Sequence, residues 1–231
     1  CTIDRLDFSN ETLSAPGNNL SQERSFLAAV SNNSYGYFGG GSAPPTVSTI
    51  DRLDFSNETL SLPGNNLSQA RQDLAAVSSS SYGYFGGGFI PPQVSTIERL
   101  DFSNETLSLP ENGLPQTRAS LAAVSSSSYG YFGGGNAPPI VCTIDRLDFS
   151  NETTSAPGNG LPQARRFLAA VSSSSYGYFG GGYSFPYRST IDRLDFSNET
   201  TSAPGNNLPQ ATNRLAAVSS SSYGYFGGGF T

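Results

Sequence analysis

The chain of 231 residues has no lysine, histidine, methionine or tryptophan, and it has only two cysteines. Without histidine it cannot contain a Ser–His or Cys–His nucleophile, so no catalytic residue of that kind is expected. Its net charge is −6, and nucleic-acid binding needs a dense positive surface, so no nucleic-acid partner is expected either. No apolar run approaches the roughly 20 residues of a membrane-spanning helix, and no basic-then-apolar leader is evident. We therefore expect no membrane span and a signal peptide that is either absent or already removed, and the sequence does not indicate the compartment.

What the sequence does have is a repeat of 47 residues, with copies that begin near residues 1, 48, 95, 142 and 189. In the first copy, short β-forming stretches separated by Ser-, Asn- and Gly-rich turns predict strands at 2–8, 12–15, 26–31 and 35–38. The spacing of Pro and Gly leaves room for no helix longer than about two turns.

Four strands in a unit of about 40 to 50 residues is typical of a propeller blade. We therefore predict an all-β fold with a single domain at 1–231, a monomeric five-bladed β-propeller of four-stranded antiparallel blades. Small residues such as Ala28, Ala29 and Gly36 place the third and fourth strands nearest the ring axis. The ring is expected to close in one shared blade, in which 215–229 supply two inner strands and 2–15 supply two outer strands.

The second copy carries Arg71, then Leu-Ala-Ala-Val at 74–77, Tyr-Gly-Tyr-Phe-Gly-Gly at 82–87, and Ile-Glu-Arg-Leu-Asp at 97–101. With this pattern, the repeat resembles the kelch repeat over all five copies. The outer-strand tryptophan of kelch units is absent. The unit is also similar to Gly-Tyr-Phe-Gly-Gly-Gly repeat proteins of marine microbes and phages. The kelch resemblance implies a propeller in which basic residues at one mouth of the channel reach an acidic ligand; the matching residues are Arg24, Arg71, Arg118 and Arg165, and Thr212 interrupts the series.

The acidic residues are mostly repeated positions. Asp4, Asp7 and Glu11 recur in every copy, with Glu98 in place of one aspartate. The group Asp4-Arg5-Leu6-Asp7 could be a catalytic carboxylate group, but a group repeated five times does not single out one catalytic centre. We therefore interpret it as a ring of ion pairs and turn hydrogen bonds that tie blade to blade. The Asn10-Glu11-Thr12 sequence is either an N-glycosylation acceptor or an asparagine-containing hairpin turn.

Cys1 and Cys142 occupy the same place in two copies, where the other copies have serine. A disulfide or metal pair is one interpretation. Equivalent positions in non-adjacent blades should lie beyond the roughly 7 Å between Cα atoms that a disulfide allows. We therefore expect two free thiols, no metal site and no cofactor.

Two stretches differ between copies, and they are the candidate binding site. One is residues 23–26 and its equivalents, before the inner strand, and the other is the linker after the glycine run. Drift at exposed loops and selection for a ligand both remain open. The predicted ligand-binding residues are Arg24, Arg71, Arg118, Arg165, Phe26, Gln72, Phe167, Asn213 and Arg214.

These residues predict a non-catalytic binding or interaction module at one mouth of the channel. Its partner would be an acidic peptide, a glycan or a protein surface, because arginine forks pair with carboxylates through two hydrogen bonds. A structural or virion-surface component is a variant of this hypothesis. The alternative is a propeller glycosidase-type hydrolase, which needs two carboxylates of different pKa. The acids that break the repeat are Glu23, Asp73 and Glu111, in three different copies.

Overall fold

The computed structural model describes residues 2–7, 9–15 and 17–231, and the described part of the chain is all β. Its strands form four sheets of four strands and two sheets of two strands. No helix in the described ranges is long and apolar enough to cross a membrane. The all-β fold class is confirmed.

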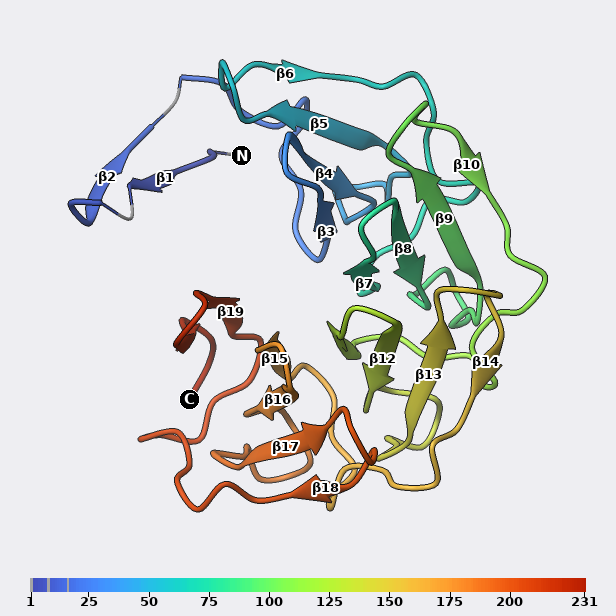
Figure 1. Cartoon of the computed structure of the whole chain (residues 1–231), viewed down its shortest axis with the longest axis vertical. Helices are drawn as coiled ribbons and strands as arrows, with labels where there is room; N and C mark the ends of the chain where they lie inside the picture. The colour runs from blue at the N-terminus through green and yellow to red at the C-terminus, as the bar shows by residue number, and fades with distance from the viewer. Residues whose placement is uncertain (1, 8, 16) are drawn as a thin grey trace.

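The four complete blades have the same strand order, from the inner strand to the outer one. The first is β3 (Ala28–Ser31), β4 (Tyr35–Gly39), β5 (Ile50–Asp54) and β6 (Leu60–Ser61). The second is β7 (Ala75–Ser78), β8 (Tyr82–Gly86), β9 (Ile97–Asp101) and β10 (Leu107–Ser108). The third is β11 (Ala122–Ser125), β12 (Tyr129–Gly133), β13 (Ile144–Asp148) and β14 (Thr154–Ser155). The fourth is β15 (Ala169–Ser172), β16 (Tyr176–Gly180), β17 (Ile191–Asp195) and β18 (Thr201–Ser202). Figure 1 shows these blades arranged around a common axis.

The blades pack through large side chains on one blade and glycines on the next. Phe85 is fully buried, and its ring lies where a Cβ on Gly39 of the preceding blade would be 2.7 Å away. Val30 lies just as close to Gly83 of the following blade, where an added Cβ would be 2.5 Å from the valine methyl. The glycines of the Tyr-Gly-Tyr-Phe-Gly stretch are therefore required by the close approach of neighbouring blades.

Ion pairs also join consecutive blades. Arg52 of the first blade contacts Glu105 of the second at 2.6 Å, and Tyr37 donates a hydrogen bond to the same carboxylate at 3.0 Å. The same pair recurs one and two blades later. Burial and that carboxylate raise the pKa of Tyr37 far above its ordinary value, so its hydroxyl stays protonated and continues to donate. Of the repeated Asp4-Arg5-Leu6-Asp7 group, the arginine therefore ties blade to blade as predicted. The two aspartate positions instead make contacts within one blade, as Asp51 and Asp54 do.

The fifth blade is divided between the two ends of the chain. It consists of β19 (Ala216–Ser219) and β20 (Gly224–Gly227) at one end, and of β1 (Arg5–Asp7) and β2 (Thr12–Ser14) at the other. These are the two inner and two outer strands predicted for a shared blade. In the described residues they are two separate sheets, and Figure 1 shows them on the same side of the ring.

Each half-blade already contacts its neighbour as a complete blade does. Arg5 of β1 pairs with Glu58 of the first blade, the equivalent of the Arg52–Glu105 pair. Phe226 of β20 packs against Gly180 of the fourth blade. What is missing is the contact of β19 and β20 with the parts of the ring that should follow them. Val218 is 64% exposed and Tyr225 is 57% exposed, although the equivalent Val30 and Tyr37 are buried. Val30 and Tyr37 are covered by the following blade, so Val218 and Tyr225 lack the corresponding cover from the first blade. We predict that closure of the ring supplies this cover and that β20 pairs with β1 in the register of β4 with β5.

Candidate functional site

The inner strands surround a central channel of about 520 Å³. It is lined in every blade by the Ala-Val-Ser segment of the innermost strand, for example Ala29, Val30 and Ser31. The prediction that the small-residue third strand lies nearest the axis is confirmed. The wall of the channel is nearly identical in all copies, so it offers no residue that distinguishes one blade from another.

One mouth of this channel is formed by the last residue of the first variable stretch. We name these residues the mouth belt; they are Phe26, Asp73, Ser120, Phe167 and Arg214. All of them have a left-handed backbone, with φ between 55° and 59°, which is uncommon for residues other than glycine. Such strained positions persist where the surroundings fix them and often lie at ligand sites.

Hydrogen bonds between blades hold the mouth belt in place. The amide of Asp73 donates to the carbonyl of Phe26 at 2.9 Å, and the amide of Ser120 donates to the carbonyl of Asp73 at 2.8 Å. The series continues through Phe167 to Arg214. Because each backbone group is bonded to the next blade, the side chains of the belt project from a fixed frame.

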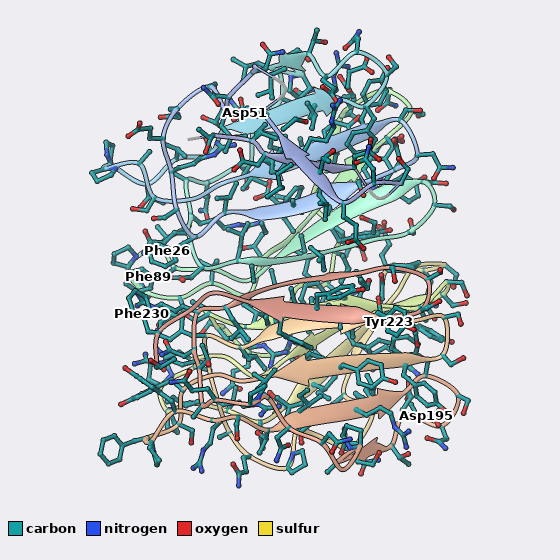
Figure 2. The ribbon with its side chains drawn as sticks, turned by 90° about the vertical axis from the view of Figure 1, so that its left-hand side faces the viewer. Phe26, Asp51, Phe89, Asp195, Tyr223 and Phe230 are labelled. Atoms are coloured by element: carbon teal, nitrogen blue, oxygen red, sulfur yellow. The ribbon has the colours of Figure 1, made fainter. Side chains whose placement is uncertain are left out.

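The second variable stretch lies beside the first. Residues directly before the belt pair with the residue that follows each glycine run, as in Gln72 with Phe89, Arg166 with Tyr183, and Asn213 with Phe230. Figure 2 places Phe26, Phe89 and Phe230 together at one edge of the molecule, with Tyr223 and Asp195 at the opposite edge. Both variable stretches therefore meet on one face of the ring.

Charge and aromatic surface are combined at the mouth. The guanidinium of Arg214 lies 4.4 Å from the ring centroid of Phe167 and 5.2 Å from that of Phe26. Cation–π contacts of this kind orient a guanidinium without neutralising it. Burial raises the pKa of the Asp73 carboxyl, while Arg214 and a hydrogen bond from Gln72 oppose the rise. The belt thus contains one cation, one anion and two aromatic rings.

The structure places Arg24, Arg71, Arg118 and Arg165 inside the blades, and this corrects the predicted arginine rim. Their side chains have no exposed surface, and each pairs with a carboxylate two strands away in its own blade. The partners are Asp51, Glu98, Asp145 and Asp192. Sequence reasoning missed these pairs, because Arg24 and Asp4 recur in separate parts of the repeat. We do not propose these arginines as ligand contacts.

The remaining predicted residues fall into two groups. Phe26, Phe167 and Arg214 line the mouth. Gln72 and Asn213 support it from the preceding position of the chain; Gln72 donates to the Asp73 carboxylate at 3.4 Å, and buried Asn213 donates to the carbonyl of Phe230 at 3.2 Å. Sequence reasoning did not include Asp73 and Ser120 among the candidate ligand-binding residues. They occupy the same position of the repeat as Phe26, and this equivalence is the sequence signal that could have identified them.

Of the two cysteines, Cys142 is an exposed free thiol, whereas Cys1 lies outside the described residues. The acids that break the repeat are also separated. Asp73 lines the mouth, while Glu23 and Glu111 are exposed residues outside its lining.

Comparisons with known proteins leave the family of the chain undetermined. No protein-family model matches the sequence, and no curated protein is significantly similar to it. The propeller architecture therefore rests on the repeat and on the blades themselves.

Proposed function

We propose that this chain is a kelch-like, non-catalytic binding module, and that its ligand is an acidic peptide or a carboxylate-bearing glycan held at the mouth belt. The observation that carries the proposal is the position of Arg214 between two phenyl rings at a mouth whose residues differ from blade to blade. A guanidinium offers a carboxylate two parallel hydrogen bonds.

The aromatic residues complete the proposed recognition. Phe26 is 38% exposed, and Phe167 is half-buried beside it, so both can cover an apolar part of the ligand. Arg166 lies over Phe167 and Tyr183 at 4.9 and 5.3 Å and adds a second cation close to the mouth. A ligand with a carboxylate next to an aromatic or sugar ring would engage both features.

The hydrolase alternative depends on Asp73. Glycosidases place two carboxylates about 5 to 10 Å apart, one of them with a raised pKa. Asp73 has the raised pKa, and it is the one carboxylate among the described residues that line the mouth. A screen of glycosides and esters with the purified chain, repeated with Asp73→Asn, distinguishes the two proposals, because only hydrolysis requires that carboxylate.

The binding proposal predicts that Arg214→Gln weakens binding of a fluorescent Glu-Phe-Glu peptide by about ten-fold, since a hydrogen bond to a charged group contributes about 1.5–3 kcal/mol. Asp73→Asn should strengthen binding, because it removes the negative charge nearest the guanidinium. Fluorescence anisotropy measures both, and added salt should weaken the wild-type complex.

The matched control is Arg188→Gln, which changes the net charge equally. Arg188 is half-buried and donates to the carbonyl of Ser184, away from the mouth lining. It should keep the wild-type affinity. Equal losses in the two variants, or no binding of the peptide at any salt concentration, would show that the mouth is not a carboxylate site.

A further inference from the structure

The face opposite the mouth carries clefts between consecutive blades. One lies between the second and third blades and has a volume of about 410 Å³; its lining comes from 79–82, 127–129 and 148–150. The next lies between the third and fourth blades, has a volume of about 440 Å³, and is lined by 126–129, 174–176 and 195–197. The second lining is the first one displaced by 47 residues, so the two are copies of one site.

The lining combines hydroxyl groups, aromatic rings and one carboxylate. In the cleft between the third and fourth blades, Tyr129 and Tyr176 are partly buried and Asp195 is the last residue of β17. The Asp195 carboxylate accepts hydrogen bonds from the amide and hydroxyl of Ser197, which lower its pKa. Arg146 and Arg193 lie over the Tyr129 and Tyr176 rings at 4.8 and 4.7 Å. Among the described residues that line the cleft itself, however, Asp195 is the charged one, so an anionic ligand is disfavoured.

The turn between the two innermost strands of each blade contains more serine hydroxyls than its own hydrogen bonds need. The hydroxyl of Ser126 accepts hydrogen bonds from the amides of Ser128 and Tyr129 at 3.3 and 3.1 Å and so shapes the turn. In the first blade the side-chain oxygen of Asn32 accepts the equivalent hydrogen bonds. The hydroxyl of the next residue, Ser127, makes no hydrogen bond within the described part of the chain. Its equivalents Ser80, Ser174 and Ser221 are likewise serine and the first copy has Asn33, whereas the exposed positions on the mouth face differ in almost every copy.

We propose that these clefts bind neutral saccharide units, one at each blade boundary, and that the serine face is a multivalent carbohydrate-binding surface. A sugar presents hydroxyls that both donate and accept, together with apolar C–H faces. Serine hydroxyls and the aspartate complement the hydroxyls, and the tyrosine and phenylalanine rings complement the C–H faces. The volumes lie within the usual range of small-molecule sites.

Repetition gives this surface its affinity. Each shallow site would bind one sugar weakly, but several sites on one rigid ring can engage neighbouring sugars of a polymer at the same time. Linked binding of this kind raises the overall affinity by a factor of about 10² to 10⁴ without any new contact. The preferred ligand is therefore a polysaccharide or a densely glycosylated surface of neutral sugars.

The test uses glucose, galactose, mannose and N-acetylglucosamine, each coupled to polyacrylamide and immobilised on a biosensor. The wild-type chain should bind at least one polymer, and the free monosaccharide should compete only at concentrations at least about a hundred-fold higher than the polymer does. Binding to none of the four polymers would overturn the proposal.

Variants then locate the site. Ser80→Ala, Ser127→Ala and Ser174→Ala combined should weaken binding to the polymer at least ten-fold and leave the melting temperature unchanged. The same three positions changed to Glu should abolish binding by blocking the clefts, which provides a second readout. Leu109→Ala, at an exposed side chain outside both the clefts and the mouth lining, should bind the polymer like the wild type. Full binding by both serine variants, or loss in Leu109→Ala alone, would overturn the assignment to the serine face and leave the mouth proposal unaffected.

Discussion

Replacing Arg165 with alanine is expected to lower the free energy of unfolding by about 3–5 kcal/mol, the usual cost of leaving one partner of a buried ion pair uncompensated. The Arg165 side chain is fully buried and contacts the Asp192 carboxylate at 2.6 Å. It also donates to the carbonyls of Phe179 and Thr190 at 3.0 and 3.1 Å. The substitution removes all of these donors at once. Thermal unfolding at pH 7 followed by circular dichroism measures the loss.

The loss should depend on pH in a direction that the structure fixes. Burial raises the pKa of Asp192 in the folded chain, and Arg165 opposes that rise. Without the arginine the folded-state pKa rises further above the unfolded value. The stability that protonation of Asp192 provides is present below the unfolded pKa, near 4, and is lost as the pH rises through the folded pKa. The difference in free energy of unfolding between the wild type and Arg165→Ala should therefore be smaller at pH 5 than at pH 7.

Two controls accompany this prediction. Arg5→Ala removes an exposed ion pair and should cost less than about 1 kcal/mol. The double variant Arg165→Met, Asp192→Leu should recover much of the lost stability, because an apolar pair of similar size removes the unpaired buried charge. If Arg165→Ala has the same melting temperature as the wild type at both pH values, the buried ion pair is not part of the folded blade.

Deleting residues 1–15 is expected to lower the melting temperature by roughly 10 °C or more. The deletion removes β1 and β2, the outer half of the fifth blade, together with the Arg5–Glu58 pair. Without β1 to pair with β20 the ring cannot close, so Val218 and Tyr225 also lose their packing against the first blade. Burial of each such side chain contributes about 1.5–3 kcal/mol. For a chain of this size each kcal/mol corresponds to about 2–4 °C. Differential scanning calorimetry measures the shift.

Adding the deleted segment back as a peptide distinguishes loss of ring closure from unrelated effects of the truncation. A synthetic peptide of residues 1–15 should bind the truncated chain and restore the melting temperature as its concentration rises. A peptide with the same composition in scrambled order is the control, and it should have no effect. A truncated chain that melts like the full chain would contradict the shared fifth blade.

The blade architecture could be predicted from the sequence because local and global signals agree. Three features of the sequence indicate the same structure, a propeller blade. They are the glycines opposite Val30 and Phe85, the alanines of the inner strand, and the Ser- and Asn-rich turns. The sequence predicted ion pairs between blades for the repeated arginine, but it did not identify the glutamate partner that Arg52 finds in Glu105.

The candidate site was only partly predictable. Arg24 precedes the inner strand, and its partner Asp51 lies two strands farther out, so their contact arises only when the sheet folds. The sequence gives no sign that this arginine turns into the blade rather than toward the mouth. Nor does it show that the two variable stretches are paired, as Arg166 and Tyr183 are. From the sequence, the mouth residues could be identified only as one position of the repeat at which the side chain differs between copies.

The fifth blade also differs from the others in one buried position. Thr212 stands where the other blades have their arginine, and its hydroxyl donates to the carbonyl of Gln210. The aspartate of that column, Asp4, is retained. The closing blade therefore lacks the ion pair found in the other four, and we expect it to be the least stable part of the ring.

Amide hydrogen exchange at the two ends of the chain tests the closed five-bladed ring most directly. The peptides 1–13 and 223–231 can be distinguished from other copies by the combination of Cys1 with Leu13 and by the final Phe230-Thr231, so mass spectrometry can follow both. If β20 pairs with β1, both peptides exchange slowly in the full chain, and 223–231 exchanges faster once residues 1–15 are deleted. Rapid exchange of both peptides in the full chain, with the four inner blades still protected, would contradict a closed ring.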